Sequence, residues 1–402
     1  MGLNDTPSAE RIHIGFFGCR NAGKSSVVNA ITGQSLAVVS DTPGTTTDPV
    51  MKAMELLPLG PVMIIDTPGF DDVGELGELR VKKTKAVLNR TDIALLVVDS
   101  TRELTNTDKQ LISLFQEKEI PYRILKNKSD LLEQVPEPRE NELYISARTR
   151  EGIETCKETV GNMASVEDRK RRIVGDLIEP SDFVLLVVPI DTAAPKGRLI
   201  LPQQQTIRDI LESDATAIVI KETEITQTLG TLGKAPALVI TDSQVFARVS
   251  AEVPPGIPLT SFSILMARYK GYLQTAVHGV SAVERLNDGD KVLISEGCTH
   301  HRQCEDIGSV KIPNWLRAYT GKKLEIELSA GREFPEDLSP YSLIIHCGGC
   351  MLNEREVRTR MKGAVEQGIP FTNYGITIAY MQGILERSTE MFSLSDELSE
   401  KS

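Results

Sequence analysis

The chain has 402 residues, a formal net charge of -11 and six cysteines. This length is enough for two or three domains with separate cores, and the acidic charge argues against binding to a nucleic-acid backbone. The longest apolar run, residues 183–190, is too short to span a membrane, and no apolar signal-peptide region opens the chain. The few, clustered cysteines are typical of a reducing compartment, so we expect a cytoplasmic protein without membrane or nucleic-acid partners.

A predicted apolar strand at 12–17 is followed at once by a phosphate-binding loop. In this pattern glycines let backbone N–H groups surround the phosphates, Lys24 reaches the β and γ oxygens, and Ser25 offers its hydroxyl to Mg²⁺. The helix that follows directs its N-terminal dipole toward the anion. The predicted nucleotide-binding residues of the loop are Gly18, Asn21, Ala22, Gly23, Lys24, Ser25 and Ser26.

Two further segments complete the predicted phosphate and magnesium site. An apolar run at 62–65 ends in Asp66, whose carboxylate can hold the Mg²⁺ shell, and the amide of Gly69 can meet the γ-phosphate. The polar loop at 41–48 contains Thr46, which we predict to bind Mg²⁺ only when the γ-phosphate is present. Lys24, Thr46 and Gly69 are therefore the predicted catalytic residues.

The identity of the nucleotide base is predicted from Asn127, Lys128 and Asp130, which follow a further strand pattern. The Asp130 carboxylate can accept hydrogen bonds from two N–H groups on the Watson–Crick edge of guanine, which adenine does not present in that arrangement. Ser146 and Ala147 complete the predicted base pocket with a backbone amide. Five motifs in the order and spacing of a small GTPase indicate GTP binding and hydrolysis.

Roughly the first 165 residues resemble the translation-factor-like GTPases of the tRNA-modification and ribosome-assembly group. Phe70 stands where Ras-like proteins carry the glutamine that orients the attacking water, a task that phenylalanine cannot perform. Some members of the group hold a potassium ion beside the phosphates, partly through an asparagine that matches Asn21. Because a cation there neutralises charge in the transition state, the resemblance implies slow hydrolysis that K⁺ stimulates more than Na⁺.

The middle of the chain shows four apolar strand patterns separated by helical stretches, at 182–188, 217–220, 237–240 and 259–262. Continuous apolarity with helical spacers favours a parallel sheet covered on both faces. This segment contains no phosphate loop, catalytic pair or ligand cluster. We therefore interpret it as a scaffold or association domain.

Thiol and imidazole side chains are concentrated in the last part of the chain, where four of the six cysteines and four of the five histidines lie beyond residue 277. The candidate ligands follow two apolar strand patterns and are Cys298, His300, His346, Cys347 and Cys350. If the two strands are neighbours, three thiols and up to two imidazoles enter one pocket. Such a set of donors suits either a zinc ion or an iron–sulfur cluster.

A GTPase followed by Cys-x-His and His-Cys-x-x-Cys motifs resembles the FeFe-hydrogenase maturation GTPases, the HydF family, over the whole chain. The resemblance implies that Cys298, Cys347 and Cys350 bind a 4Fe-4S cluster. The family is a scaffold or carrier, on which radical-SAM maturases build a transient diiron precursor that is delivered to the apo FeFe-hydrogenase. The fourth ligand stays open among His346, His300, Glu305 and Asp306.

The expected fold is α/β throughout. We predict a P-loop GTP-binding domain at 8–168, a parallel α/β association domain at 173–262 that forms a homodimer, and an α/β iron–sulfur domain at 263–402. An amphipathic helix over 263–287 is expected to open the last of these.

Two alternatives keep the GTPase and change the rest of the function. Three thiolates and an imidazole also suit a zinc site that merely stabilises the last domain. A ribosome-associated or tRNA-associated GTPase is the other alternative, but the acidic charge and the lack of a recognisable basic RNA-binding module argue against it.

Overall fold

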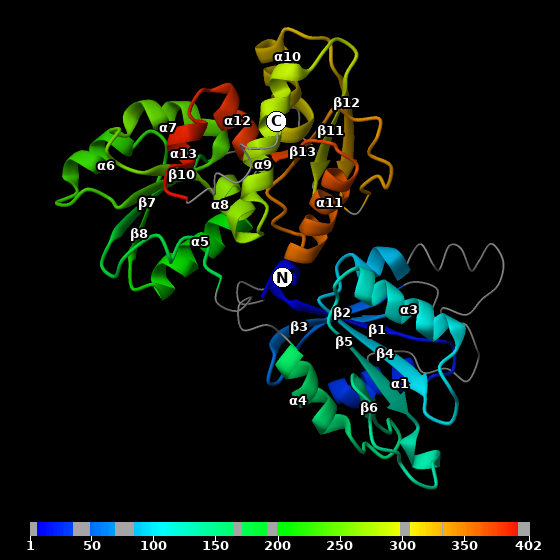
Figure 1. The fold of residues 1–402 in the computed structure, drawn as a ribbon. Helices are drawn as coiled ribbons and strands as arrows, with labels where there is room; N and C mark the ends of the chain where they lie inside the picture. The colour runs from blue at the N-terminus through cyan, green and yellow to red at the C-terminus, as the bar shows by residue number, and fades with distance from the viewer. Residues whose placement is uncertain are drawn as a thin grey trace. The chain divides into compact units, whose positions relative to one another are not determined.

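A computed structural model of the chain describes residues 6–34, 49–68, 84–163, 171–190, 199–297, 306–331 and 333–392. The chain forms two compact units, Met1–Lys170 and Arg171–Ser402, each built around its own parallel strands (Figure 1). Within the described ranges, no helix has the length and apolarity needed to cross a lipid bilayer.

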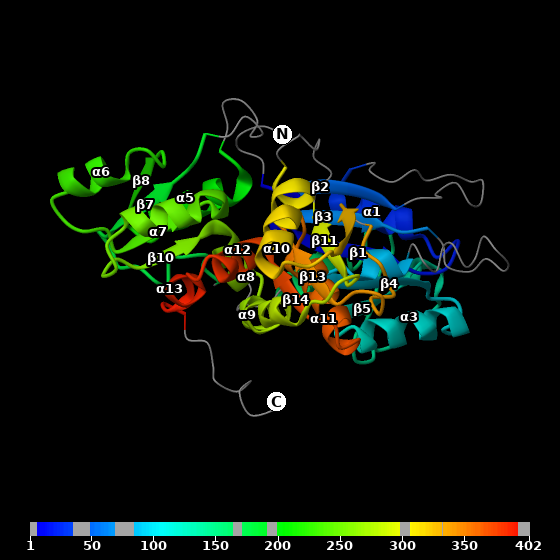
Figure 2. The same cartoon turned by 90° about the horizontal axis from the view of Figure 1, so that it is seen from above.

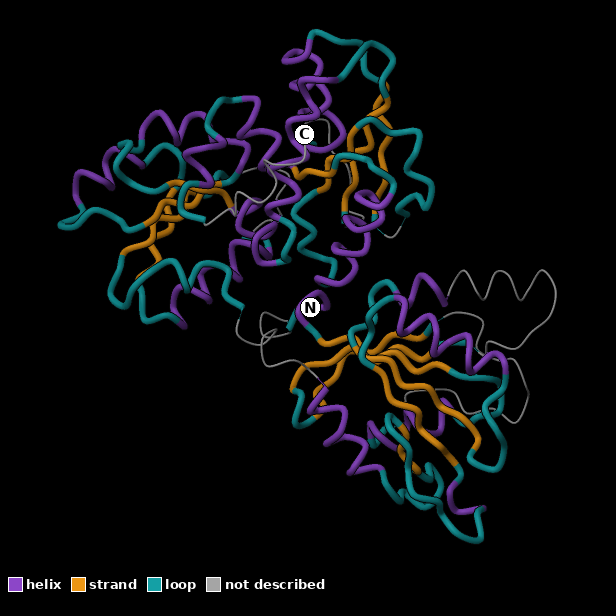
Figure 3. Tube along the Cα trace, in the orientation of Figure 1, coloured by secondary structure: helices purple, strands orange, loops and turns teal. Residues whose placement is uncertain are grey.

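The N-terminal unit is built on one sheet of six strands in the order β2-β3-β1-β4-β5-β6. β2 is antiparallel to β3, and the other neighbouring pairs are parallel. The strands are β1 (Ile12–Phe17), β2 (Val50–Leu56), β3 (Gly60–Asp66), β4 (Ile93–Asp99), β5 (Tyr122–Asn127) and β6 (Glu142–Tyr144). Figure 3 shows them as orange tubes with helices on either side.

Helices cover both faces of this sheet, which explains why its central strands are continuously apolar. Val27 and Val160 pack against one face, and Leu111 and Phe115 pack against the other. The helical elements are η1 (Ser8–Glu10), α1 (Lys24–Thr32), α3 (Asn106–Glu117), η2 (Ser129–Leu131) and α4 (Ile153–Met163). Because both faces are occupied, the loops at the carboxyl ends of the parallel strands are the part of the sheet left to form a site.

The C-terminal unit contains two sheets, each of four parallel strands, and the predicted parallel α/β architecture is confirmed. The orders are β8-β7-β9-β10 and β12-β11-β13-β14, so both sheets place their strands in the sequence second, first, third, fourth. The strands are β7 (Phe183–Val187), β8 (Thr216–Ile220), β9 (Leu238–Thr241), β10 (Leu259–Ser261), β11 (Lys291–Glu296), β12 (Glu325–Ala330), β13 (Leu343–His346) and β14 (Phe371–Asn373).

A single hydrophobic cluster joins the two sheets and their helices. The helices are α5 (Leu201–Glu212), α6 (Ile225–Thr231), α7 (Phe246–Glu252), α8 (Phe262–Tyr269), α9 (Leu273–Gly279), α10 (Ile312–Thr320), α11 (Glu354–Glu366), α12 (Tyr374–Met381) and α13 (Leu385–Thr389). Shorter turns are η3 (Ser243–Val245), η4 (Val280–Arg285) and the π-helical η5 (Ile307–Lys311).

The single helix predicted over 263–287 is wrong. The structure divides this stretch into α8, α9 and η4. Gly271 interrupts it with a left-handed φ of 72°, a conformation that glycine adopts without steric cost and that ends a helix. The predicted domain boundary at 262/263 falls after the first residue of α8, which follows β10 without a linker.

The two sheets of the C-terminal unit also share sequence. Residues 256–273 and 368–385 align without a gap and are identical at eight of 18 positions, which in the first segment are Gly256, Ile257, Pro258, Thr260, Ile264, Ala267, Gly271 and Leu273. The strands that open the two sheets are preceded by the same turn, in which Asp182 accepts from the Glu179 amide and Asp290 accepts from the Asn287 amide. The unit is therefore an internal repeat.

The two repeats exchange their last helices. α9, which follows the first sheet, packs against β14 of the second, and α13 packs against β10 of the first (Figure 2). At the centre, the Gly375 amide donates to Ser263 Oγ at 3.2 Å, and these two residues occupy equivalent positions in the aligned segments. Reciprocal contacts of this kind are those of an approximate two-fold arrangement.

Candidate functional site

The phosphate loop connects β1 to α1 and depends on two glycines. Gly18 and Gly23 have φ values of 138° and 87°, where other residues are strained. A Cβ on Gly18 would lie 2.2 Å from the carbonyl oxygen of Val97, and one on Gly23 would lie 2.4 Å from Nδ2 of Asn127. The loop therefore keeps the predicted phosphate-binding conformation because no side chain fits at either position.

The magnesium side of this loop is formed by Ser25 and Asp66, which the structure brings together. Ser25 Oγ donates to Asp66 Oδ2 at 2.9 Å, and the Lys24 ammonium donates to the carbonyl oxygens of Gly18 and Cys19, each at 2.9 Å. Burial raises the pKa of Asp66, while the Ser25 hydrogen bond and the Lys24 charge lower it in part. Asp66 Oδ1 is buried without a hydrogen-bond partner among the described residues, which suits an oxygen that faces a cation.

The base pocket lies at the carboxyl ends of β5 and β6. Asn127 Nδ2 donates to the Ala22 carbonyl at 3.0 Å, and Asn127 Oδ1 accepts from the Ala147 amide at 3.1 Å. Ser146 Oγ donates to Asp130 Oδ1 at 2.6 Å and so fixes the carboxylate predicted to read guanine. Asn127 thus joins the phosphate loop to the base pocket.

Lys128 is held by a residue that the sequence patterns did not indicate. It has a left-handed φ of 66°, and its ammonium pairs with Asp99 at 2.6 Å. Burial tends to raise the pKa of Asp99, but hydrogen bonds from Lys128 and Thr101 outweigh it and lower the pKa to about 2. The position of Asp99 at the end of β4, beside β5, was the available signal, because carboxyl ends of neighbouring parallel strands meet.

Five predicted site residues lie outside the described residues and stay predictions: Thr46, Gly69, Cys298, His300 and Glu305. Asn21 has a left-handed φ of 62° in the phosphate loop and is exposed. Ser26 lies in the first turn of α1.

The cysteine site begins where β11 and β13 end side by side, with Ser295 paired to His346. This neighbourhood was predicted from the two apolar runs, and it places Gly297, the residue before Cys298, against the loop that follows β13. Cys347 Sγ accepts hydrogen bonds from the amides of Gly297 at 3.0 Å and Gly349 at 3.3 Å. Two N–H donors aimed at one sulfur favour its thiolate form.

The pKa values of both thiols are raised in the structure. Burial raises the pKa of Cys347, against the two amide hydrogen bonds that lower it, and burial raises the pKa of Cys350 to about 11. Cysteine binds a metal ion as the thiolate, so metal binding at these two residues would release their protons. Among the described residues, no group of three or more Cys, His, Asp or Glu side chains forms a metal site, and Cys298 and His300 are outside that set.

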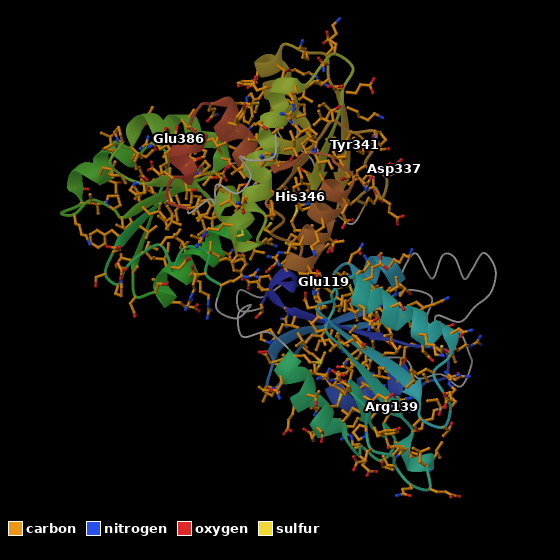
Figure 4. The ribbon with its side chains drawn as sticks, in the orientation of Figure 1. Glu119, Arg139, Asp337, Tyr341, His346 and Glu386 are labelled. Atoms are coloured by element: carbon orange, nitrogen blue, oxygen red, sulfur yellow. The ribbon has the colours of Figure 1, made fainter. Side chains whose placement is uncertain are left out.

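His346, labelled in Figure 4, is fully buried at the end of β13. Its Nδ1 lies 2.7 Å from the carbonyl oxygen of Cys347, and its Nε2 lies 3.2 Å from Nη1 of Arg360. Because a guanidinium can only donate, Nε2 accepts and Nδ1 carries the proton. Burial, followed by the Arg360 charge, lowers the pKa of His346 to about 3. Iron binding by His346 would break one of these hydrogen bonds.

Comparisons with known families cover the chain in three pieces. The hydrogen maturase F dimerization domain matches residues 173–271, and the hydrogen maturase F tetramerization domain matches residues 274–391. A GTPase family described as the 50S ribosome-binding GTPase matches residues 13–128. The chain belongs to the hydrogen maturase F (HydF) family. This HydF chain therefore joins a segment that matches a GTPase family to two segments that match the self-association domains of its family.

Curated relatives match part of this HydF chain. The tRNA modification GTPase MnmE of Nitrosomonas europaea is 35% identical over 153 residues, which is 37% of the chain and 34% of that protein. MnmE of Natranaerobius thermophilus is 29% identical over 216 residues, 50% of the chain and 44% of that protein. The chain thus spans less than half the length of these relatives.

Two solved structures are similar to the HydF chain at low TM-scores. An Era variant from Aquifex aeolicus bound to GDP and aluminium fluoride has 16% identity and a TM-score of 0.33, covering 56% of the chain and 98% of Era. An NFeoB variant from S. thermophilus bound to GMPPNP has 23% identity and a TM-score of 0.30, covering 41% and 71%. At these TM-scores, nothing about the HydF chain is inferred from either structure.

Two buried cations beside the HydF cysteines were missed from the sequence. Arg360 of α11 is 6% exposed and Lys270, which follows α8, is 4% exposed. A signal existed for Arg360, since it lies between the buried residues Val357 and Ala364 at helical spacing and so faces the core. Lys270 had no such signal, because its partners lie 79 and 82 residues away.

Proposed function

We propose that this protein is a GTP-hydrolysing scaffold that binds a 4Fe-4S cluster and carries the diiron precursor of the FeFe-hydrogenase active site to the apo-hydrogenase. Membership of the HydF family supports the maturation role. The observation that carries the cluster proposal is Cys347, whose sulfur already accepts two backbone N–H bonds beside the end of β11. Amide donors to sulfur are a recurring feature of iron–sulfur sites.

In this proposal the thiolates of Cys298, Cys347 and Cys350 hold three irons of the cluster. When bound, the cluster supplies one further iron whose ligand can exchange, which is the position where a diiron cargo can attach. The chain's own residues shape this place: the glycine-rich turn carries two sulfurs, and the cargo would bind at the carboxyl ends of the strands, where open α/β sheets bind their ligands. His346 and His300 are the proposed candidates for the fourth iron.

The test is an EPR spectrum of the dithionite-reduced protein after anaerobic reconstitution with iron and sulfide. We expect a fast-relaxing S = 1/2 signal of the 4Fe-4S type that is lost in Cys298→Ala, Cys347→Ala and Cys350→Ala. Cys304→Ala, outside the motif, is the matched control and keeps the signal. A colourless protein with stoichiometric zinc would overturn the cluster proposal and leave a GTPase with a structural metal site.

We also propose that GTP hydrolysis depends on K⁺ bound through Asn21, with Thr46 and Gly69 completing the catalytic site. The left-handed φ of Asn21 and its exposure on the phosphate loop support a ligand role toward a cation beside the phosphates. We expect at least tenfold faster hydrolysis in KCl than in NaCl at equal ionic strength, and loss of the difference in Asn21→Ala. Equal rates in the two salts would contradict the proposal.

Self-association follows from the HydF family, and we propose that the homodimer forms through the segment at 173–271. The edge strand β8 supports this, because it is wholly apolar except for Thr216 and its Val219 is 44% exposed. Unpaired apolar edge strands are templates for pairing with a second chain. Radical-SAM maturases and the apo-hydrogenase are the proposed partners of the dimer.

A further inference from the structure

The loop of residues 347–352, called here the cysteine loop, is packed closely between two helices. A Cβ on Gly349 would lie 2.9 Å from Val357 of α11, and a Cβ on Gly348 would lie 3.7 Å from Met266 of α8. Gly349 also has a left-handed φ of 65°. A side chain therefore does not fit at Gly349, and α8 forms one wall of the loop.

Lys270 connects α8 to the cysteine loop through its side chain. Its ammonium donates to the carbonyl oxygen of Gly349 at 2.6 Å and to that of Leu352. These two carbonyls enclose Cys350 in the sequence. An ammonium group removed from water is costly unless its hydrogens find acceptors, and here the backbone of the loop supplies them. The contact therefore fixes both ends of the turn that carries the second cysteine.

The internal repeat shows that this contact is specific to the cysteine loop. Gln382 occupies the position equivalent to Lys270, directly after α12, and it is exposed to solvent. Lys270 follows the equivalent helix yet is 4% exposed. The fold of the repeat alone does not bury this position, so the burial of Lys270 arises from the loop that it binds.

The charge of Lys270 acts at the thiols as well. The Lys270 ammonium lies against the carbonyl oxygen of Gly349, the residue before Cys350, so its charge is beside the second thiol. The Arg360 guanidinium donates to Nε2 of His346, the residue before Cys347, and to the carbonyl oxygen of Gly331. The loop thus has a buried cation from α11 and another that follows α8, and both favour negative charge on sulfur.

We propose that Lys270 is a positioning residue of the iron–sulfur site: it holds the cysteine loop in the shape that two thiolates need and places positive charge beside them. Lys270 belongs to the segment that matches the HydF dimerization domain, whereas the loop belongs to the segment that matches the tetramerization domain. The residue therefore links the association segment to the metal site. This inference rests on the proposed 4Fe-4S site.

The experiment compares Lys270→Met, Lys270→Gln and Lys270→Arg with Gln382→Met, the control at the equivalent position. Reconstituted proteins are tested for the rate of iron loss to a chelator and for the midpoint potential of the cluster. We expect Lys270→Met to lose iron at least tenfold faster. We also expect the midpoint potential of its cluster to fall by about 59 mV, which is a tenfold change in the reduction equilibrium. Lys270→Gln, which keeps a donor without the charge, shifts the potential with less effect on iron loss.

Lys270→Arg keeps the charge and should hold the potential near that of the wild type. Near-UV circular dichroism checks that each variant is folded. If Lys270→Met does not fold, comparing Lys270→Gln with Lys270→Arg still separates the effect of the charge from that of the hydrogen bonds. Wild-type potentials and iron retention in folded Lys270→Met and Lys270→Gln would overturn the inference.

A second measurement needs no cluster and so separates this inference from the proposed function. In the metal-free protein, the rates of hydrogen exchange at the backbone amides of residues 349–352 are followed by mass spectrometry. We expect these rates to rise at least fivefold in Lys270→Met and to stay unchanged in Gln382→Met, because the loop opens when its anchor is lost. Equal rates would overturn the positioning role, whereas failure of the wild type to bind a cluster would contradict the proposed function alone.

Discussion

The backbone amide of Gly375 donates a hydrogen bond to the side-chain oxygen of Ser263, and the two residues are equivalents in the two repeats of the C-terminal unit. Ser263 is the second residue of α8 and Gly375 is the second residue of α12, so the helix that lines one wall of the cysteine loop contacts its own counterpart. The position of α8, and with it the position of Lys270, therefore depends on the close approach of these two helix starts.

We expect Gly375→Ala to destabilise the C-terminal unit. The added Cβ would lie 2.7 Å from Cβ of Ser263 and 3.0 Å from the hydroxyls of Ser243 and Ser261. Overpacking of this kind costs about 1–3 kcal/mol. Gly363→Ala in α11 is the matched control, since no atom lies within 4 Å of its new Cβ and alanine favours a helix. Urea unfolding followed by circular dichroism measures both, and equal midpoints would refute the close contact.

We expect Asn127→Ala to weaken GTP binding by about 10- to 100-fold. The substitution leaves the buried Ala22 carbonyl and the Ala147 amide without their partner, and each lost hydrogen bond costs about 1 kcal/mol. Titration with a fluorescent GTP analogue measures the affinity. Asn141→Ala, at a turn before β6, removes an asparagine of the same unit and should leave the affinity unchanged. An unchanged affinity in Asn127→Ala would contradict the joining role given to its amide.

We expect Asp99→Asn to reduce the acid sensitivity of the N-terminal unit. The folded-state pKa of Asp99, about 2, is below the ordinary value of 3.8, so its stabilisation is present above pH 3.8 and is lost as the pH falls toward 2. Asp99→Asn lacks the stabilisation that the ionised carboxylate provides, so its free energy of unfolding should fall less between pH 3.8 and pH 2. Urea unfolding between pH 2 and 5 measures this difference. The control is Glu154→Gln, which removes an ion pair between Glu154 and Lys157 on α4.

Asp99→Asn should also weaken GTP binding modestly at neutral pH, because Lys128 loses its anchor beside the base pocket. If Asp99→Asn loses stability at low pH as the wild type does and also binds GTP with the same affinity, the Asp99–Lys128 ion pair has no role in stability or binding.

We expect Val219→Lys on β8 to convert the proposed homodimer into a monomer. A lysine on an edge strand opposes pairing with a second strand, and Val219 is exposed, so folding of the monomer is not affected. Light scattering coupled to size-exclusion chromatography measures the mass. Val365→Lys, an equally apolar and exposed position on α11, is the control. A dimer that persists in Val219→Lys would place the association surface elsewhere.

The sequence by itself determined the nucleotide chemistry. The phosphate loop, Asp66 and the residues around Asn127 were all predicted, and the structure brings those that it describes to one edge of the sheet. These motifs can be read because each places its glycines, lysine or carboxylate in a few consecutive residues, where local backbone conformation decides what the side chains can reach. The parallel α/β sheets were predicted for the same reason, from short apolar runs.

The sequence also contains the internal repeat, which neither its motifs nor its apolar runs reveal. Residues 256–273 and 368–385 share glycines, prolines and core positions, and comparing the chain with itself finds them. The hydrophobic pattern over 263–287 suggested one helix, because the pattern does not show that Gly271 takes a left-handed φ.

The surroundings of the cysteines were decided by tertiary structure. Lys270 reaches carbonyls 79 and 82 residues away, and the Arg360 guanidinium meets the His346 ring across two elements of the second repeat. Charged residues are ordinarily exposed, so nothing in the local sequence of Lys270 indicates that it is buried. Cysteine spacing fixes which sulfurs can share a site, whereas the cations that tune those sulfurs are set by how distant helices pack.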